Sequence, residues 1–488
     1  MERSKFTVAP KPGTNIIWRG QVHSYENVTE RIDALKSIIR SLKTKGSSLV
    51  GLLVPRSEWQ IICPIAVLEC NQAYVPMNMA WPIERIRNIL DCTAPATVIA
   101  DKAFSEESPQ LFQGYSCQGA CGSLAVFAKE GHGKGAAIKD IAYIIFTSGT
   151  TGSPKGVAIS RDALQSFKES FGRMMELEEG KRILSLAEYS FDMFVPEGVL
   201  ALSWGLDIIM AEPLDIINPR RIVRMLLGHR PDYMQITPSA LGMISMIDPG
   251  LDSLASISKL MVGAESFPEN LFATVKRGFK GAIYNLYGPT EATVWCCGGE
   301  ITRQGRVHVG KELEGCEIAI IGEDGQETGS LEEGEICIAG AQLAEGYWDN
   351  EEENGKKFFY LRGKRFYRSG DIGYRDKTGR ISCLGRKDDQ IKLHGYRIEL
   401  GEIESVSRRF DGVVDALAAV DSRADRKRLV VFLIADGQFE EERFWTYLEG
   451  QLPAYGIPEA CIRVNGFAYS ENGKADRKKM LEEFRRNS

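Results

Sequence analysis

The stretch AYIIFTSGTTGSPKGV, residues 142–157, contains an apolar strand pattern followed by a loop rich in glycine, serine and threonine. Glycines let backbone amides approach an anion closely, hydroxyl groups add hydrogen-bond donors, and Lys155 adds a positive charge. The loop is not a P-loop of the GxxxxGKS or GxxxxGKT type, because Lys155 follows Pro154 and precedes a glycine and the strand-like VAIS. The pattern therefore predicts a loop that binds a polyphosphate at the end of a buried strand.

On both sides of this loop, helical patterns alternate with short apolar runs. Val28, Ile32, Leu35 and Ile39 recur at helical spacing before the apolar run LVGLLVP at 49–55. Two further units of this kind are RIVRMLLG before YMQIT, and residues 267–280 before AIYNLYG. Helices that alternate with continuous apolar strands predict an α/β fold with largely parallel sheets covered by helices on both faces.

The pattern changes after about residue 300, where glycine turns separate short strands of alternating polarity. Two such turns are Glu323-Asp324-Gly325 and Lys377-Thr378-Gly379, and they predict a β-rich subdomain. The charge-dense stretch GRKDDQ at 385–390 then precedes a helical pattern and the strand-like LVVFLIA. We therefore expect a large, multi-layered N-terminal domain, residues 1–386, and a small, mobile α+β C-terminal domain, residues 387–488.

Composition excludes several classes of protein. The 488 residues carry a formal net charge of -6, so no overall positive field attracts nucleic acid or an anionic membrane. The longest apolar runs have about eight residues, far fewer than the roughly 20 that a membrane-spanning helix needs. The 11 cysteines are scattered through apolar segments, which is typical of reduced thiols. Because the N-terminus also lacks a signal-peptide pattern, we expect a soluble cytoplasmic protein without structural disulfides.

Four further motifs follow the loop in order. They are YNLYGPTEATV at 284–294, YRSGDIG at 367–373, GRKDDQIKLHGYRIELGEIE at 385–404 and NGKADRKK at 472–479. Together with the loop, they resemble the adenylate-forming superfamily of acyl-CoA synthetases, luciferases and nonribosomal peptide synthetase adenylation domains. The run QIKLHGYRIEL is most similar to amino-acid adenylation domains and D-alanine–carrier protein ligases. The resemblance implies an enzyme that uses ATP and Mg²⁺ to convert a carboxylate into an acyl adenylate, and then passes the acyl group to a thiol.

The resemblance also implies which residues hold the phosphates. Thr290 donates to the α-phosphate, and Glu291 holds Mg²⁺, a hard cation that prefers oxygen ligands. The phosphate loop is expected to contribute Thr147, Ser148, Gly149, Thr150, Thr151, Gly152 and Lys155.

For the nucleoside, the resemblance points to two pairs of residues. Tyr287 offers a flat ring for the adenine, and Asn285 lies where the family contacts the purine edge. Asp371 is placed to accept hydrogen bonds from both ribose hydroxyls, with Arg386 as a second ribose or phosphate contact.

Lys474 matches the catalytic lysine of the family, which bridges the substrate carboxylate and the nucleotide. Both reacting groups are anions, so a positioned cation cancels charge as the carboxylate attacks the α-phosphorus. Asp388 matches the hinge between the large and small domains. Rotation about this hinge is expected to exchange Lys474 for a thiol-transfer face, so that one active site serves two half-reactions.

The segment SFDMF, residues 190–194, matches the place where amino-acid adenylation domains carry an aspartate for the substrate ammonium. Asp192 fits that role, because a partly buried carboxylate is costly unless a cation pairs with it. The other predicted wall residues include no second charge, which favours a small or medium uncharged amino acid. These wall residues are Met193, Pro196, Gln235, Leu260, Val262, Leu286, Val294 and Trp295.

The chain ends about 14 residues after Lys474, which favours a free-standing ligase that serves the phosphopantetheine thiol of a separate carrier protein. One alternative is an acid–CoA ligase that acts on an aryl or acyl acid and uses free CoA. A D-alanine–carrier protein ligase is a second alternative, although Val262 stands where those enzymes carry a cysteine. A third is a nucleotide-binding regulatory or structural protein, against which the retained Lys474, Glu291 and Asp371 argue.

Overall fold

The computed structural model describes residues 6–42, 49–129, 140–148, 154–387, 390–393, 395–423, 426–468 and 475–487. The chain divides into two compact units. The first comprises residues 1–79, 90–146 and 156–387, and the second comprises residues 80–89, 147–155 and 388–488. Within the described ranges, no helix combines the length and the apolar character needed to cross a membrane.

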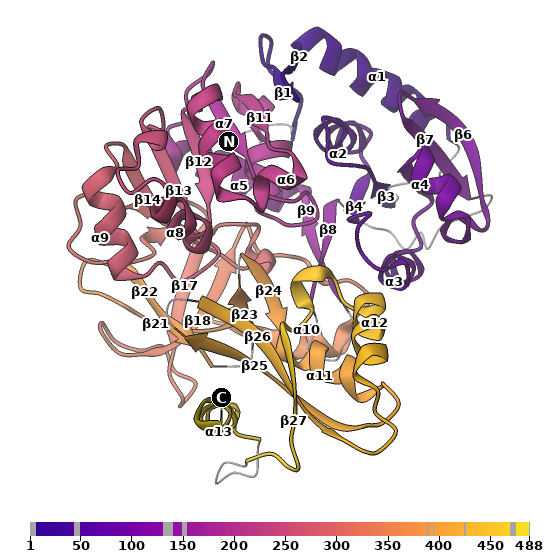
Figure 1. Ribbon diagram of the computed structural model, residues 1–488. Coiled ribbons are helices and arrows are strands. Elements are labelled where there is room, and N and C mark those ends of the chain that lie inside the picture. The colour runs from indigo at the N-terminus through magenta and orange to yellow at the C-terminus, as the bar shows by residue number, and fades with distance from the viewer. Residues whose placement is uncertain are drawn as a thin grey trace. The chain divides into compact units, whose positions relative to one another are not determined.

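A nine-stranded sheet organises much of the first unit (Figure 1). In spatial order its strands are β16 (Lys311–Glu312), β15 (Cys297–Glu300), β14 (Ala282–Tyr287), β13 (Lys259–Val262), β12 (Tyr233–Ile236), β10 (Arg182–Ser185), β11 (Asp207–Met210), β1 (Ile16–Trp18) and β2 (Gln21–His23). The strands from β14 to β1 pair in parallel, and only the edge strands are antiparallel. The apolar runs YMQIT and AIYNLYG thus form central parallel strands, as the sequence predicts.

Helices cover both faces of this sheet and enclose two separate apolar cores. On one face, α7 (Pro219–His229), α8 (Pro238–Ile247) and α9 (Glu269–Gly278) bury their apolar sides together with Leu260 and Val262. On the other face, α5 (Arg161–Met175) packs into a core that contains Met261. Successive side chains of a strand point to opposite faces, so β13 contributes to both cores.

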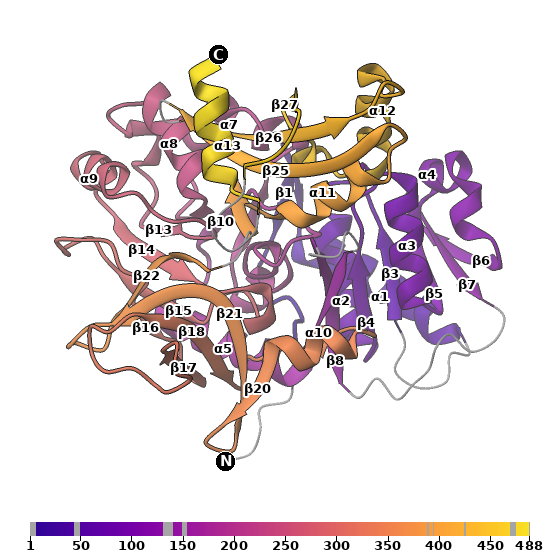
Figure 2. The same cartoon turned by 90° about the horizontal axis from the view of Figure 1, so that it is seen from below.

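An eight-stranded sheet forms the second large layer of this unit (Figure 2). Its strands are β19 (Gly346–Tyr347), β9 (Lys155–Ser160), β8 (Ile141–Thr147), β4 (Ala73–Pro76), β3 (Leu49–Leu53), β5 (Thr97–Asp101), β7 (Leu124–Lys129) and β6 (Tyr115–Cys121). The helices in this part of the chain are α1 (Tyr25–Ser41), α2 (Trp59–Glu69), α3 (Ile83–Thr93), whose first residues group with the second unit, and α4 (Lys102–Glu107). The predicted periodicity is confirmed in α1, which begins after the N-cap Ser24 and buries Val28, Ile32, Leu35 and Ile39.

The glycine turns after residue 300 belong to a five-stranded antiparallel sheet, which confirms the predicted β-rich subdomain. Its strands are β17 (Cys316–Ile321), β18 (Gly334–Gly340), β20 (Phe358–Leu361), β21 (Lys364–Arg375) and β22 (Ile381–Arg386). The helix α10 (Glu351–Lys357) leads directly into β20, and α6 (Pro213–Ile216) follows β11 in the chain. In the β21–β22 turn, the Asp376 carboxylate accepts from the backbone amides of Thr378 at 2.8 Å and Arg380 at 2.9 Å.

The second unit is an α+β domain with its own core, as the sequence predicts. It contains the hairpin β23 (Gln390–Leu393) and β24 (Tyr396–Glu399), the three-stranded sheet β25 (Val413–Arg423), β26 (Arg426–Ala435) and β27 (Ala460–Arg463), and the helices α11 (Leu400–Arg408), α12 (Glu441–Gln451) and α13 (Arg477–Asn487). The large α/β unit and the small α+β unit together confirm the predicted fold class. All 11 cysteines are free thiols.

Candidate active site

The predicted nucleoside residues meet where β14 and the β21–β22 hairpin end. The Tyr287 hydroxyl donates to Asp371 Oδ2 at 2.7 Å, and Arg386 Nη1 lies 3.0 Å from Asp371 Oδ1. Asp371 and Arg386 are cross-strand partners on β21 and β22, which explains their contact. Burial, with a smaller contribution from the Asp371 charge, raises the pKa of the Tyr287 phenol, so the phenol stays neutral and donates. The structure thus brings together Tyr287, Asp371 and Arg386, three of the four residues predicted to bind the nucleoside.

Asn285 lies two residues earlier on β14 and is turned toward the chain that follows β15. Its Nδ2 donates to the carbonyl oxygen of His308 at 2.9 Å, and its side chain is buried. The loop after β14 is tightly folded, because a Cβ at Gly288 would lie 2.3 Å from the carbonyl oxygen of Val294. Only glycine fits there.

Glu291, the predicted magnesium ligand, is fully buried in a short helical turn, Thr290–Ala292. Its Oε1 accepts from the Tyr347 hydroxyl at 2.6 Å. The described residues contain no group of three side chains that would enclose a metal ion. A single carboxylate still fits Mg²⁺, because this cation keeps several waters and is held largely by substrate phosphates.

The phosphate loop is described only at its two ends, which belong to the second unit. Ser148 Oγ donates to the carbonyl oxygen of Arg397 at 2.8 Å, and Thr147 Oγ1 lies 3.5 Å from the carbonyl oxygen of Lys155. Lys155 itself is largely buried. The predicted residues Gly149, Thr150, Thr151, Gly152, Asp388 and Lys474 lie outside the described residues.

Three residues of the predicted wall are joined by a chain of hydrogen bonds. Trp295 Nε1 donates to Gln235 Oε1 at 2.8 Å, and Gln235 Nε2 donates to the Met193 carbonyl oxygen at 2.8 Å. The indole lies against Gly263, where an added Cβ would come within 2.7 Å of the ring. Leu286 and Val294 belong to the same core as Trp295, and Pro196 is buried in the short helix Val195–Val199.

The structure does not bring Leu260 and Val262 to this wall. Both side chains are fully buried in the core beneath α7, α8 and α9, on the opposite face of the sheet. Met261, which the sequence analysis passed over, pairs with Gln235 in register and lies on the same face as Trp295. Because successive side chains of a strand point to opposite faces, the sequence KLMV of β13 already separates Leu260 and Val262 from Met261.

Asp192 is partly exposed, as expected of a carboxylate that meets a substrate ammonium. Its charge acts on Tyr143, a fully buried residue of β8 whose pKa is raised by burial first, then by Tyr74 and Asp192. The Tyr143 hydroxyl has no hydrogen-bond partner within the described parts of the chain. Because Asp192 acts on this hydroxyl, Tyr143 is a candidate for contact with a bound substrate group.

A buried arginine, which sequence reasoning missed, fixes the segment that leads to Asp192. Arg56 follows β3 and donates to the carbonyl oxygens of Ala211 (2.6 Å), Ala187 (2.5 Å) and Ser185 (2.9 Å). Glu197 accepts from the amide of Ala187, and burial raises the pKa of this carboxyl to about 8. In the sequence, Arg56 is recognisable as a single arginine directly after the apolar run at 49–55.

Tyr189 ties the same segment to β3 and β4. Its hydroxyl accepts from the Val54 amide at 3.3 Å and donates toward the carbonyl oxygens of Leu52 (2.9 Å) and Met77 (2.6 Å). The segment 185–189 is therefore anchored to both large sheets just before Asp192. We call Arg56, Tyr189 and Glu197 the anchor residues.

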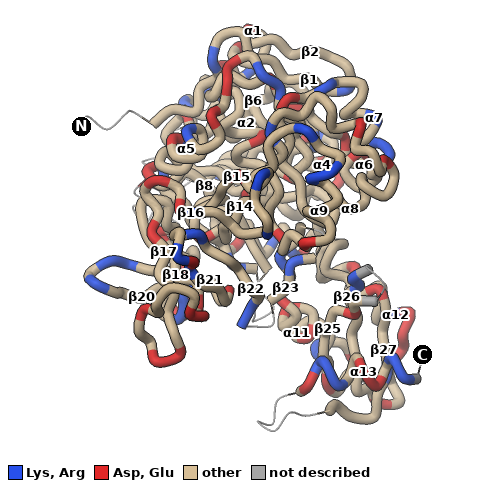
Figure 3. The backbone as a smooth tube through the Cα atoms, turned by 90° about the vertical axis from the view of Figure 1, so that its left-hand side faces the viewer, with Lys and Arg blue, Asp and Glu red and all other residues tan. Residues whose placement is uncertain are grey.

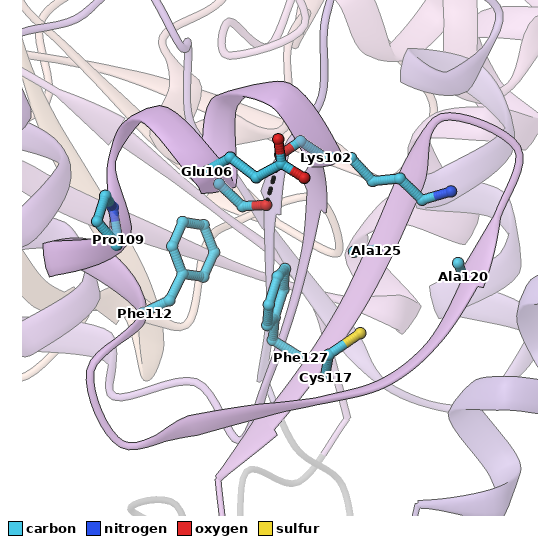
Figure 4. A pocket seen from close by; sticks show the side chains of 9 residues that line it. Lys102, Glu106, Pro109, Phe112, Cys117, Ala120, Ala125 and Phe127 are labelled. Carbon is cyan, nitrogen blue, oxygen red and sulfur yellow. Dashed lines mark hydrogen bonds between the residues drawn. The ribbon is translucent and has the colours of Figure 1, made fainter.

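The first unit also has an open hollow of about 490 Å³ beside α4 (Figure 4). Phe112 and Phe127 form its apolar wall with ring centroids 4.7 Å apart, and Lys102, Glu106 and Cys117 lie around it. None of the residues predicted to bind nucleotide or substrate lines this hollow.

The fold is that of an adenylate-forming enzyme. Amide bond synthetase McbA from Marinactinospora thermotolerans superposes with a TM-score of 0.85 at 18% identity, covering 97% of this chain and 98% of that one. The chain belongs to the family of AMP-binding enzymes, whose sequence pattern matches residues 7–348.

Two relatives are similar in sequence over most of this chain. D-alanine--D-alanyl carrier protein ligase from Bacillus licheniformis is 33% identical over 435 residues, covering 86% of each chain. Tyrocidine synthase 3 from Brevibacillus parabrevis is 29% identical over 472 residues, covering 95% of this chain but 7% of that much longer protein. The homologues thus include nonribosomal peptide synthetase segments and a ligase that acts on a carrier protein, which confirms the resemblance inferred from the motifs.

Proposed function

We propose that the protein adenylates a small or medium uncharged amino acid with ATP and Mg²⁺, and transfers the aminoacyl group to the phosphopantetheine thiol of a separate carrier protein. Family membership supports the adenylation step. The hydrogen-bonded wall of Met193, Gln235 and Trp295 carries the substrate assignment, because a rigid indole against Gly263 leaves little room for a long side chain. The similarity to a D-alanyl carrier protein ligase supports a carrier as the acceptor.

In this proposal each residue has a defined task. Asp192 pairs with the substrate ammonium, and the anchor residues hold the segment that carries it. Tyr287, Asp371 and Arg386 hold the nucleoside, while Thr290 donates to the α-phosphate. Lys474 neutralises the substrate carboxylate and the phosphate as they approach. Glu291 would hold Mg²⁺ together with the phosphates, and the ion would supply further neutralisation of phosphate charge.

The experiment is ATP–pyrophosphate exchange with L- and D-amino acids and aryl acids, followed by transfer to either CoA or a holo-carrier protein. We expect exchange with small or medium uncharged amino acids and transfer to the carrier. Strong exchange with an aryl or acyl acid and transfer to free CoA would instead establish an acid–CoA ligase. Exchange restricted to D-alanine would establish the D-alanine ligase.

The variant Lys474→Ala distinguishes an adenylating enzyme from a protein that binds nucleotide but does not catalyse adenylation. We expect exchange to fall about 10²- to 10³-fold, since Lys474 is assigned to stabilise charge in the transition state. Binding of ATP and the thermal midpoint should stay near the wild-type values. Lys479→Ala, in the same terminal region but exposed on α13, serves as the matched control. Unchanged exchange in Lys474→Ala would contradict the proposed mechanism.

A further inference from the structure

The hydroxyl group of Tyr347 meets the buried carboxylate of Glu291 inside the first unit. It donates to Glu291 Oε1 at 2.6 Å, and Glu291 is fully buried while Tyr347 is 4% exposed. A distance of this size is typical of a hydrogen bond to an ionised carboxylate, which is stronger than a bond between neutral groups. The Tyr367 hydroxyl lies farther away, 3.4 Å from that of Tyr347. Because Tyr347 gives its one proton to Glu291, Tyr367 is the donor in this second contact.

The main chain of Tyr347 is fixed by Asn354, a residue of α10. The Tyr347 amide donates to Asn354 Oδ1 at 2.7 Å, and the Tyr347 carbonyl oxygen accepts from Asn354 Nδ2 at 2.9 Å. Strand pairing adds a second constraint, since Tyr347 is the register partner of Val157 on β9. Gly346, at φ +144°, permits this fit, because an added Cβ would lie 2.6 Å from Asn354 Oδ1. The Tyr347 side chain therefore extends from a fixed backbone.

The same segment also holds the main chain of Glu291. The amide of Ala344 donates to the carbonyl oxygen of Glu291 at 2.8 Å. Arg365 in turn donates to the carbonyl oxygens of Ala344 and Glu345, both at 2.8 Å. We call residues 344–347 the support segment. It contacts Glu291 at the backbone and at the carboxylate, so one piece of chain holds both parts of this residue.

Aromatic packing restricts the direction of the Tyr347 ring. Phe358 and Tyr367 are register partners on β20 and β21, which lie side by side (Figure 3). The Phe358 ring lies 5.9 Å from the ring of Tyr347 and 5.2 Å from that of Tyr367, measured between centroids. The Arg365 guanidinium lies over the Phe358 ring, 4.1 Å from its centroid. With its backbone fixed and its ring packed in this way, Tyr347 keeps its hydroxyl directed at Glu291.

The direction of the Glu291 carboxylate matters because this residue is the one assigned to Mg²⁺. Mg²⁺ demands near-ideal octahedral geometry and is usually bound by only one or two carboxylates, so the orientation of each carboxylate counts. Hydrogen bonds from neighbouring residues orient metal ligands, and their loss typically lowers metal affinity or activity about 10- to 100-fold. A hydrogen bond to Oε1 from a fixed hydroxyl opposes rotation of the carboxylate group.

We propose that Tyr347 is a positioning residue for the adenylation step, and that its hydroxyl orients the Glu291 carboxylate for the Mg²⁺ that accompanies ATP. This inference rests on the proposed function, which assigns Glu291 to that ion. The support segment and Asn354 hold Tyr347 in place, and Tyr347 acts only through Glu291. Loss of the hydroxyl therefore changes the dependence on Mg²⁺ and leaves the binding of the amino acid unaltered.

Tyr347→Phe removes the hydroxyl and keeps the ring, and direct titration with ATP in the absence of amino acid measures binding without chemistry. We expect the factor by which saturating Mg²⁺ tightens ATP binding to fall about tenfold, with ATP affinity in EDTA unchanged. In exchange assays, the Mg²⁺ concentration for half-maximal rate should rise by a similar factor, while the KM for the amino acid changes less than twofold. Tyr115→Phe, which loses a hydroxyl that donates to the Pro95 carbonyl oxygen at 2.7 Å, is the matched control.

A double-mutant cycle with Glu291→Gln tests whether Tyr347 acts through Glu291. In the Glu291→Gln background, Tyr347→Phe should cause no further change in the Mg²⁺ dependence of ATP binding. A further loss in the double variant would overturn the inference, as would a lower thermal midpoint of Tyr347→Phe with wild-type Mg²⁺ dependence. If Tyr347→Phe does not fold, Asn354→Ala decides, since it keeps the hydroxyl but releases the Tyr347 backbone and should weaken the Mg²⁺ dependence severalfold.

Failure of the inference and failure of the proposed function give different results. Wild-type Mg²⁺ dependence in Tyr347→Phe, together with a weakened dependence in Glu291→Gln, would overturn the inference and leave the proposed function intact. Absence of exchange with every amino acid would refute the proposed function, whereas the ATP titrations would still decide whether Tyr347 orients Glu291.

Discussion

At the scale of single residues, Tyr143 is one of several buried side chains with a polar atom that has no hydrogen-bond partner within the described parts of the chain. Its hydroxyl is fully buried and lacks a partner within the described parts of the chain, and the charge of Asp192 acts on it. An unsatisfied buried polar group costs about 1–3 kcal/mol. A substrate ammonium held by Asp192 would place a donor where this hydroxyl can accept.

Tyr143→Phe removes only the hydroxyl. If the hydroxyl contacts the substrate, we expect the KM for the amino acid to rise severalfold while the thermal midpoint stays the same or increases. A stability loss with unchanged KM would mean that the hydroxyl has a structural partner instead. Tyr74→Phe is the matched control, because the Tyr74 ring lies 5.5 Å from the Tyr143 ring and is equally buried.

Asp192→Asn keeps the shape of the side chain and removes its charge. We expect the KM for the amino acid to rise about ten- to a hundredfold, roughly 1.4–2.8 kcal/mol, because a partly desolvated ion pair is lost. Steady-state kinetics at saturating ATP measure this effect, and the KM for ATP should change little. An unaltered KM for the amino acid would show that its ammonium binds elsewhere.

At the scale of elements, the anchor residues join the segment after β10 to the ends of β3 and β4. Glu197 belongs to this junction. Burial raises its carboxyl pKa to about 8, and its Oε2 has no partner within the described ranges. The folded protein therefore binds a proton that the unfolded chain releases above its ordinary pKa of about 4.3. In this range the free energy of unfolding falls as the pH rises.

Glu197→Gln replaces the protonated carboxyl with a neutral group of similar shape. For the wild-type protein, we expect Glu197 to contribute a decrease of up to about 1.4 kcal/mol per pH unit in the free energy of unfolding, between about pH 4.3 and pH 8. Urea unfolding of both proteins across this range measures the difference. The variant should lose this part of the pH dependence and gain relative stability at pH 8. Parallel pH profiles would mean that Glu197 is ionised in the fold.

A substitution in the predicted pocket wall tests which size of substrate the pocket accepts. Trp295→Leu removes the indole and its hydrogen bond to Gln235, so the pocket becomes larger. We expect kcat/KM for larger apolar amino acids to rise about tenfold relative to the smallest ones, since each methylene accommodated is worth about 1–3 kcal/mol. Exchange assays over the amino-acid panel measure the shift. Trp204→Leu, a change of the same kind away from the wall, should leave the preference unaltered.

Elements were easier to predict than the pocket they form. Periodicity predicts α1, and continuous apolar runs predict β3, β12 and β14, because burial imposes these local patterns. Motif spacing placed Leu260 and Val262 in the wall, yet their strand turns them to the opposite core. The anchor contacts of Arg56 reach residues about 130 to 155 positions away, and no local pattern specifies such contacts.

At the scale of the whole molecule, the chain is built from two units whose border carries the predicted hinge. The first unit runs to Lys387 and the main part of the second begins at Asp388. Residues 147–155, the predicted phosphate loop, group with the second unit although they lie far from it in sequence. That grouping depends on contacts such as Ser148 with Arg397, which the sequence could not predict. The predicted catalytic residue Lys474 belongs to the second unit, whereas the predicted nucleoside residues Tyr287, Asp371 and Arg386 belong to the first.

Asp388→Pro tests whether one site serves both half-reactions through rotation at this border. Proline fixes its own φ near −65° and restricts Lys387 before it, so the hinge loses most of its range. We expect amino-acid exchange to change less than threefold while transfer to the holo-carrier falls about 10- to 100-fold, because only the second step needs the other arrangement. Asp388→Ala, which keeps a flexible backbone, is the control and should transfer normally. Equal losses in both half-reactions would indicate that residue 388 supports folding of the second unit instead of its movement.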